Sequence, residues 1–289
     1  MRIVSLVPSL TETLFALGAG DSVVGITDFC IFPEGIDRPR IGGTKTPNVA
    51  KIRELRPDVV YMNIEENLKK HADEIATFAR VVATEPKTID DVAKLIAELG
   101  TTHGCETKAA EYIQLLTANC EPRTAFTFVV PIWKKPWMWC GGDTYVSNLV
   151  ESVGGRNLLR DCARYPRLEL EDVLALKADI VFLPDEPYAF TEADAAAITA
   201  PHPASGHPLP ADAGRGPSHD APLPLAGEGA AKRRVRVIGP FPGHLFTWHG
   251  VRTIEGLRFL RRVLSPLPPT AGSSRRPRRA ASKKSDRRR

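Results

Sequence analysis

Two acidic residues, Glu65 and Glu186, occupy matching places in two copies of one sequence pattern. Residues 55–67 (LRPDVVYMNIEEN) and residues 176–188 (LKADIVFLPDEPY) correspond at a constant offset of 121 positions. In each copy an apolar run typical of a buried strand is followed at once by the acidic loop. Equivalent carboxylates on two related units could lie beside a ligand held between them, or pair with cations of a two-fold symmetric partner. Glu66 is the alternative candidate in the first copy.

Tryptophans form the second group of residues that could contact a ligand. Three of the four fall within residues 133–139, and the fourth, Trp248, precedes a predicted helix. Prolines and two lysines, Lys134 and Lys135, interrupt the first group, which favours an irregular exposed loop over a core segment. Exposed indole rings suit a large, flat, apolar ligand, and the lysines suit anionic substituents at its edge.

No catalytic pattern accompanies these residues. The sequence contains no G-x-S-x-G, no H-E-x-x-H, no P-loop and no G-x-G-x-x-G after its first strand, so it predicts a non-catalytic protein without a metal or cofactor of its own. His244 and His249 flank Trp248 and could contact a ligand or a metal centre, although a single loop histidine more often does neither. His71 and His103 are expected to be solvated helix residues.

The elements that carry these residues predict an α/β fold of two Rossmann-like lobes with mostly parallel sheets. Residues 1–87 form the first lobe and residues 121–265 the second. The loops beyond the carboxyl ends of such strands bind ligands, which places the site between the lobes. Ser9 and Glu12 have the spacing of a capping box at the start of the first helix.

Residues 88–120 link the lobes. Two apolar stripes at a 3.6-residue period, with Thr88 as a helix cap, predict one helix of about 45 Å over residues 88–119. A rigid strut of this length predicts that the lobes move little when a ligand binds. Gly100 and Gly104 are the positions at which this helix could break.

Composition sets two segments apart from the folded part of the 289-residue chain. Residues 200–233 hold seven prolines and five glycines without periodicity, which predicts a disordered insertion. Residues 266–289 form a disordered basic tail, and residues 271–289 alone contribute +8 to the net charge of +5. The tail has no interleaved aromatic residues, so nucleic acid is not an expected partner. No run of 18 apolar residues predicts a membrane span, and the first core strand begins at the start of the sequence without a preceding export signal, so a cytoplasmic location is expected.

The quoted repeat and its surroundings resemble a known family. The runs IVSLVPSLTETLFALGAGDSVVGITDFC and IGGTKTPNVAKIRELRPDVVYMNIEEN resemble the first lobe of type III substrate-binding proteins of ABC importers, which carry cobalamin, haem and iron–siderophore complexes. The runs PWMWCGGDTYVSNLVESVGG and LFTWHG resemble the helical-backbone metal-receptor branch. By motif position the resemblance implies the following ligand-binding residues: Pro8, Ser9, Asp28, Gly43, Trp133, Asp143, Tyr165, Tyr188 and Trp248.

This resemblance implies a monomeric, periplasmic receptor that captures a metal chelate, cobalamin first, and delivers it to an ABC transporter permease. It assigns Glu65 or Glu66 and Glu186 to docking on that permease. The missing export signal, the insertion and the basic tail depart from the family pattern. The missing signal favours an alternative, a cytosolic chelatase-like enzyme that processes corrinoids or tetrapyrroles, and the absence of a catalytic pattern counts against it.

Overall fold

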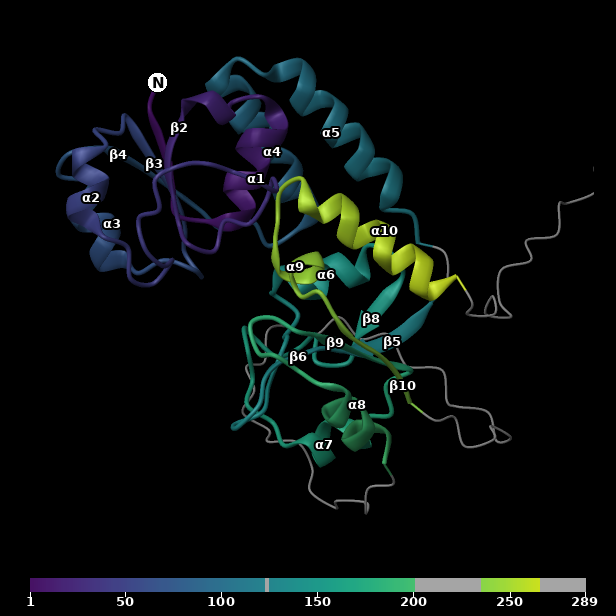
Figure 1. Ribbon diagram of the computed structural model, residues 1–289. Helices are drawn as coiled ribbons and strands as arrows, with labels where there is room; N and C mark the ends of the chain where they lie inside the picture. The colour runs from purple at the N-terminus through teal and green to yellow at the C-terminus, as the bar shows by residue number, and fades with distance from the viewer. Residues whose placement is uncertain (123–124, 201–234, 266–289) are drawn as a thin grey trace, which may run out of the picture.

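Two four-stranded parallel sheets form the centres of two lobes (Figure 1). The computed structural model describes residues 1–122, 125–200 and 235–265, so the predictions for the insertion and the basic tail lie outside the described residues. The first lobe contains β1 (Ile3–Ser5), α1 (Pro8–Leu17), a 3-10 turn η1 (Gly20–Ser22), β2 (Val23–Ile26), α2 (Val49–Glu54), β3 (Val59–Asn63), α3 (Lys69–Ile75) and β4 (Arg80–Thr84). The second contains β5 (Phe126–Val129), β6 (Pro131–Trp133), β7 (Met138–Trp139), α6 (Tyr145–Glu151), β8 (Gly155–Asn157), α7 (Leu170–Ala175), β9 (Ile180–Pro184), α8 (Glu192–Thr199), β10 (Arg236–Phe241), α9 (His244–Thr247) and α10 (Arg252–Leu264).

The sequence repeat is a structural repeat. The strand orders are β2-β1-β3-β4 and, counted from the corresponding edge, β8-β5-β9-β10, so each lobe places its strands in the same order apart from the small β6–β7 hairpin. β3 and β9 are the equivalent third strands, and all five residues of each are buried. The predicted class of two α/β lobes with parallel sheets is confirmed.

The equivalence extends to single residues of the repeat. Arg56 and Lys177 both adopt positive φ angles, 45° and 58°, where a short helix turns into the strand. Asp58 accepts a hydrogen bond from the Arg2 N–H, and Asp179 accepts one from the Thr127 N–H. In both lobes the aspartate therefore ties the start of the third strand to the start of the first.

The predicted linking helix is two helices. α4 (Ile89–His103) ends at Gly104, whose φ of 68° reverses the chain, and α5 (Glu106–Asn119) follows. Thr88 caps α4 as predicted, by a reciprocal capping box with Asp91. The single helix was wrong because Gly104 can adopt the left-handed conformation that terminates helices.

α4 and α5 nevertheless join the lobes, running in opposite directions. The Ile89 N–H at the start of α4 donates to Asn148 of the second lobe (2.9 Å), and His103 at its end shares a hydrogen bond with Tyr61 of the first (2.8 Å). α5 then returns, and Asn119 accepts from Arg261 of α10. His103 is thus not a solvated residue, because its ring bonds to Tyr61 of the first lobe. His71 is also partly buried, and its Nδ1 has no hydrogen-bond partner among the described residues.

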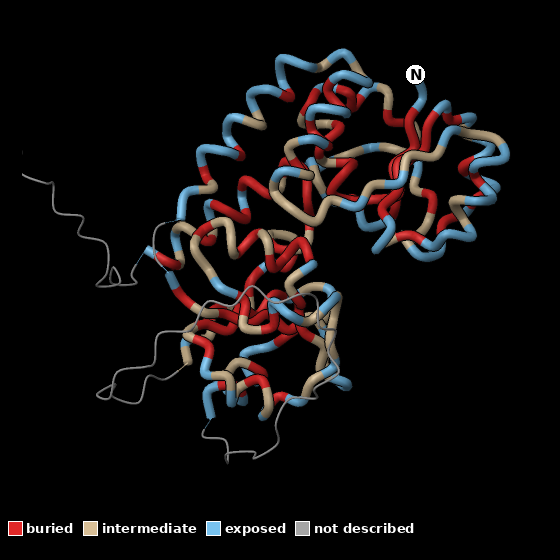
Figure 2. The backbone as a smooth tube through the Cα atoms, turned by 180° about the vertical axis from the view of Figure 1, so that it is seen from behind, coloured by how far each residue is buried: buried red, intermediate tan, exposed pale blue. Residues whose placement is uncertain are grey.

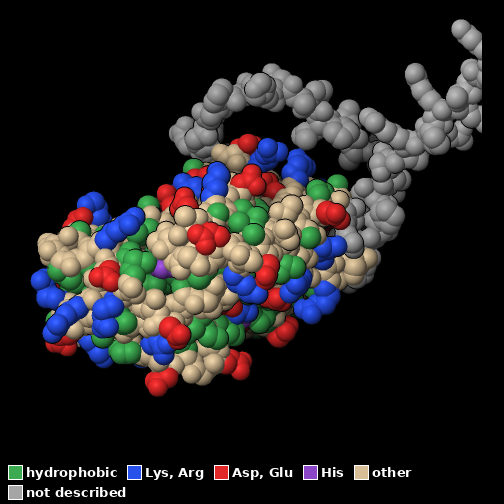
Figure 3. All heavy atoms as spheres, turned by 90° about the horizontal axis from the view of Figure 1, so that it is seen from above, with side chains coloured by type: hydrophobic (Ala, Val, Ile, Leu, Met, Phe, Trp, Pro, Cys, Tyr) green, Lys and Arg blue, Asp and Glu red, His purple; other side chains and the backbone are tan. Residues whose placement is uncertain are grey.

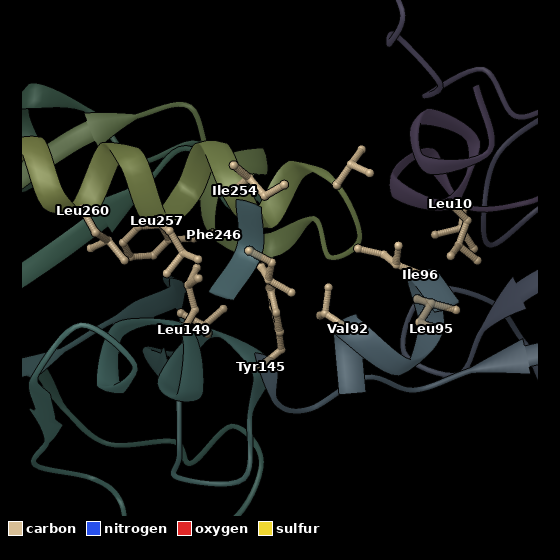
Figure 4. Close-up of a cluster of buried hydrophobic side chains, with 14 of the residues drawn as sticks. Leu10, Val92, Leu95, Ile96, Tyr145, Leu149, Phe246, Ile254, Leu257 and Leu260 are labelled. Atoms are coloured by element: carbon tan, nitrogen blue, oxygen red, sulfur yellow. The ribbon is translucent and has the colours of Figure 1, made fainter. Parts of the chain in front are cut away.

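A shared hydrophobic core occupies the space between the lobes. Side chains of α1, α4, α6, α9 and α10 meet in one buried cluster (Figure 4), and α5 adds Leu116. Two further clusters cover the outer faces of the two sheets. Figure 2 shows the result, with buried residues on the sheets and on the helices between the lobes. A common core resists relative motion, so small lobe movements remain an expectation, now based on this core and not on a single long helix.

The capping box expected at the first helix does not form. Helix α1 begins at Pro8, two residues earlier than predicted, with Val7 at the cap position and no side-chain cap. The Ser9 hydroxyl is buried without a partner among the described residues, and Glu12 pairs with Arg252 of the second lobe instead. Proline favours the first helical position, which shifted the start of the helix.

Candidate functional site at the junction of the two lobes

The two repeat-related acids lie at the carboxyl ends of equivalent strands. Glu65 follows β3 by two residues, and Glu186 follows β9 by two residues. Loops of the two lobes meet at this edge of the sheets, where parallel α/β folds bind their ligands. The junction between the lobes is therefore the candidate site.

Glu65 bonds directly to the other lobe. One carboxylate oxygen lies 2.9 Å from an Arg164 guanidinium nitrogen, and the other accepts a hydrogen bond from the Tyr165 hydroxyl, also at 2.9 Å. Burial and the nearby Glu65 carboxylate raise the pKa of Tyr165, so this hydroxyl keeps its proton at neutral pH. A second Arg164 nitrogen lies 3.5 Å from Glu85 of the first lobe.

Glu66 lies deeper than Glu65 and lacks a hydrogen-bonded cation. Its side chain is partly buried, and no described residue donates a hydrogen bond to its carboxylate. Burial raises the pKa of Glu66 to about 7; Lys45 opposes this rise, and Glu65 and Glu186 add to it. The charges of Glu65 and Glu186 therefore act on the Glu66 carboxyl across the junction.

Glu186 is partly buried on the second lobe. Burial raises its pKa, and Asp185 adds to the effect, whereas a hydrogen bond from the Trp248 side chain opposes it. Trp248 is itself only 8% exposed and packs edge-on against Phe32 of the first lobe, with ring centroids 5.9 Å apart. Glu186 is thus linked to the first lobe through an aromatic contact.

Phe32 inserts into the second lobe. Its ring contacts His244 at 5.4 Å between centroids, and the Arg252 guanidinium lies 3.9 Å from its centroid. Arg252 also pairs with Glu12 of α1. These contacts hold one side of the junction closed, and the bonds of Glu65 hold the other.

The tryptophans of residues 133–139 divide into exposed and buried side chains. Trp133 is 41% exposed and meets Tyr188 edge-on at 5.5 Å. Trp139 is fully buried, donates its indole N–H to the Leu168 carbonyl, and stacks with Trp137. Part of this segment therefore stabilises the second lobe: Trp139 is in its core, and Lys134 pairs with Asp194 of α8.

The other predicted ligand residues differ in accessibility. Pro8 and Ser9 are buried in the first turn of α1. Asp28 is exposed, whereas Gly43 is partly buried beside the ring of Phe29. Asp143 is exposed and accepts a hydrogen bond from the Arg164 backbone N–H.

The two loop histidines have different surroundings. His249 is 5% exposed with an unpartnered Nε2, and burial lowers its pKa to about 4, so it is neutral. His244 contacts Phe32 and Trp248, and burial lowers its pKa as well. Within the ranges that the structure covers, no group of three or more His, Cys, Asp or Glu side chains could hold a metal ion.

Exposed apolar side chains gather near the same edge. Five of the seven exposed large hydrophobic residues in the described ranges lie in or beside loops that follow strand ends, namely Phe29, Ile31, Ile64, Leu68 and Trp133. The remaining two, Met1 and Leu115, lie elsewhere. An edge that combines apolar surface with carboxylates suits a large ligand with an apolar face and polar substituents.

Arg164, Phe32, Arg252 and Glu85 contribute to the junction without having been predicted. Arg164 directly precedes Tyr165, and its positive φ of 55° is unusual for a residue other than glycine. An arginine in a non-repetitive loop next to a predicted ligand residue was the only available signal. Phe32 and Arg252 carry no such signal, because their contact joins segments 220 positions apart.

Charge on the visible surface is mixed. On the face in Figure 3, acidic and basic side chains are interspersed with hydrophobic ones. None of the helices in the described part is long and apolar enough to cross a membrane.

The profile of the periplasmic binding protein family matches residues 3–199, which is more than half of the chain. The chain belongs to the periplasmic binding protein family. Two relatives are an uncharacterised ABC transporter substrate-binding lipoprotein from Bacillus subtilis (26% identity over 64% of this chain) and the vitamin B12-binding protein of Vibrio cholerae (24% over 63%). The aligned regions span 63% and 69% of these proteins.

Solved structures of the family share this fold. The periplasmic vitamin B12-binding protein of Vibrio cholerae matches with a TM-score of 0.67 at 19% identity, covering 92% of this chain and 96% of that one. A periplasmic haem-binding protein of Pseudomonas aeruginosa matches with a TM-score of 0.69 at 20% identity, covering 92% and 93%. At these identities the likeness establishes the two-lobe fold.

Proposed function

We propose that this chain is the substrate-binding component of an ABC importer and captures a metal chelate at the junction of its two lobes. Cobalamin is the first candidate, and haem or an iron–siderophore complex are the others. The observation that carries the proposal is the gathering of exposed apolar side chains and repeat-related carboxylates at one edge of a two-lobe frame from the periplasmic binding protein family. Named relatives that bind vitamin B12 support the choice of ligand.

The predicted ligand residues form the proposed contact set, with Trp133, Tyr165 and Tyr188 as its most accessible aromatic members. Trp248 lies behind them as a support, because it is largely buried against Phe32. As a receptor for an importer the protein would act outside the cytoplasmic membrane as a monomer. No relative named above is described as an enzyme, so the chelatase-like alternative gains no support from them.

Binding to a metal chelate can be measured with the full chain. We expect cyanocobalamin to quench tryptophan fluorescence with a Kd well below about 100 µM, the weak end of useful capture. Haemin and a ferric siderophore should be titrated in parallel to rank the ligand classes. If none of the three binds below this limit, the proposed function is wrong. Metal insertion into a free porphyrin or corrin during the same incubation would instead support the enzyme.

Docking on the permease is the second part of the proposed function. Glu65 and Glu186 are the proposed pair, because they are equivalent in the repeat; Glu66, which is the deeper acid, is assigned to the ligand side of the junction. Replacing Glu186 by alanine is expected to weaken docking to a reconstituted ABC permease about tenfold, as for the loss of one charged contact, with little change in ligand affinity. Glu192→Ala, an exposed acid of the same lobe, is the control. Equal effects of the two variants would argue against a specific docking role.

A further inference from the structure

Glu65 is held at the junction by two groups that belong to one loop of the opposite lobe. The Arg164 guanidinium and the Tyr165 hydroxyl each lie 2.9 Å from a different oxygen of its carboxylate. Both oxygens of a residue proposed for docking are therefore used across the lobe boundary. We call these three residues, Glu65, Arg164 and Tyr165, the cross-lobe latch.

The second-lobe side of the cross-lobe latch is built on backbone bonds. The Gly141 N–H donates to the Arg164 carbonyl (2.8 Å), and the Gly142 N–H donates to the Cys162 carbonyl (3.0 Å). A Cβ atom at Gly141 would lie 2.9 Å from the Arg164 carbonyl oxygen and 2.2 Å from that of Cys162, so only glycine allows this approach. Backbone contacts within the second lobe thus fix the position of the Arg164 loop independently of Glu65.

The first-lobe side is equally ordered. The Glu65 backbone N–H donates to the Asn63 side chain (2.8 Å), and Lys45 donates to the Glu65 carbonyl. Asn67 ties this turn to Thr44 by a hydrogen bond of 2.9 Å. A carboxylate and its cation therefore meet with little remaining freedom, which lowers the entropic cost of the bond.

The cross-lobe latch is open to a competitor. The side chains of Glu65 and Arg164 are 35% and 43% exposed, so a cation of another protein can reach the carboxylate from solvent. Ion pairs at such exposure are weak, because water screens them. A guanidinium presented by a docked partner can therefore displace Arg164.

We infer that the Glu65 carboxylate serves two mutually exclusive bonds, one to Arg164 and Tyr165 that closes the junction and one to a cationic side chain of the permease. This inference rests on the proposed function, because it takes the permease as the partner. Docking then removes Glu65 from the cross-lobe latch and frees the two loops that it joins, while the shared core keeps the lobes together. By linkage, closing of the latch and docking at Glu65 must weaken each other.

Hydrogen exchange of the ligand-free full chain tests the cross-lobe latch without any partner. In Glu65→Gln, Arg164→Gln and Tyr165→Phe, segments 62–68 and 160–168 should exchange roughly 2- to 5-fold faster, as for the loss of a weak, solvent-screened bond. Asp73→Asn, which removes the exposed pair with Lys69 inside the first lobe, should leave both segments unchanged. Tyr165→Phe removes only a hydroxyl and remains informative if a charge variant fails to fold. Wild-type exchange in all latch variants that fold would overturn the inference.

Docking to a permease in nanodiscs then tests the competition by its sign. Arg164→Gln and Tyr165→Phe each remove one of the two cross-lobe bonds of Glu65 and should tighten docking several-fold, whereas Glu65→Gln should weaken it. If the three residues only stabilise the fold, docking should weaken in all three variants. If Glu65 only docks, Arg164→Gln and Tyr165→Phe should dock like the wild type. Either result contradicts the inference. If even the wild-type chain binds neither a permease nor a metal chelate, the proposed function fails, and the exchange experiment still decides whether the latch exists.

Discussion

Replacing Trp133 by alanine is expected to weaken binding of the metal chelate roughly 5- to 150-fold. Trp133 is 41% exposed at the edge where loops of both lobes meet, and its ring rests edge-on against Tyr188. Loss of one aromatic contact that becomes buried on binding costs about 1–3 kcal/mol, which corresponds to this range in Kd. Titration of the variant with cyanocobalamin, monitored by the absorbance of the corrin, measures the change.

Leu115 supplies a matched control for this experiment. Its side chain is also 41% exposed, but it lies on α5, away from the strand ends. Leu115→Ala should bind the ligand like the wild-type protein, and both variants should retain the wild-type Tm because neither side chain is in the core. An unchanged Kd in Trp133→Ala would remove Trp133 from the proposed ligand contacts.

Replacing Glu66 by glutamine is expected to stabilise the protein at pH 8. Burial raises the pKa of Glu66 from 4.5 to about 7, so the folded state binds the proton more tightly than the unfolded state. This rise corresponds to about 3 kcal/mol for a fully shielded group, and partial exposure reduces it to about 1–2 kcal/mol. The pKa of this acid is raised, so its ionisation destabilises the folded state increasingly as the pH rises from about 4.5 to about 7.

Thermal unfolding at two pH values checks this sign. At pH 8 the Tm of Glu66→Gln should exceed that of the wild type by about 2–8 °C, since 1 kcal/mol shifts Tm by about 2–4 °C in a protein of this size. At pH 4.5 the difference should nearly vanish, because the wild-type carboxyl is then protonated in the folded state. Glu192→Gln, at an exposed position, should change neither value. A pH-independent gain would show that burial of the charge is not its cause.

Such a gain in stability would mark Glu66 as a residue retained for function. Its charge interacts with those of Glu65 and Glu186, and no described residue donates a hydrogen bond to its carboxylate. A binding site commonly keeps groups that the fold alone would not favour. Ligand titration of Glu66→Gln alongside the unfolding experiment would show whether binding weakens as stability rises.

The sequence by itself determined the two lobes and the positions of their acids. A repeat at an offset of 121 positions can be read directly from the sequence. The strand and helix periodicity within each copy depends only on neighbouring residues and not on how the elements pack. It predicted an equivalent buried strand in each copy with an acidic loop after it, which β3 and β9 confirm. Thr88 could likewise be assigned as a cap, because capping involves residues only three positions apart.

Only the tertiary structure decided which partners these residues have. Glu65 meets Arg164, 99 positions away, and Phe32 meets Arg252, 220 positions away, through contacts that no local period encodes. The same holds for the tryptophans: Trp133 is exposed, whereas Trp139 and Trp248 are buried by neighbours distant in the chain.

The linker and the first helix illustrate the same limit. Gly104 permits either a continuous helix or a left-handed end, and packing of α4 and α5 into the core shared by the lobes favours two helices. Ser9 has the right spacing for a capping box, but helix α1 begins at Pro8 and Glu12 pairs with Arg252 across the junction. The spacing of residues in the sequence predicts which local hydrogen bonds can form. Which of them do form depends on side chains that are distant in the chain and become neighbours only in the folded protein.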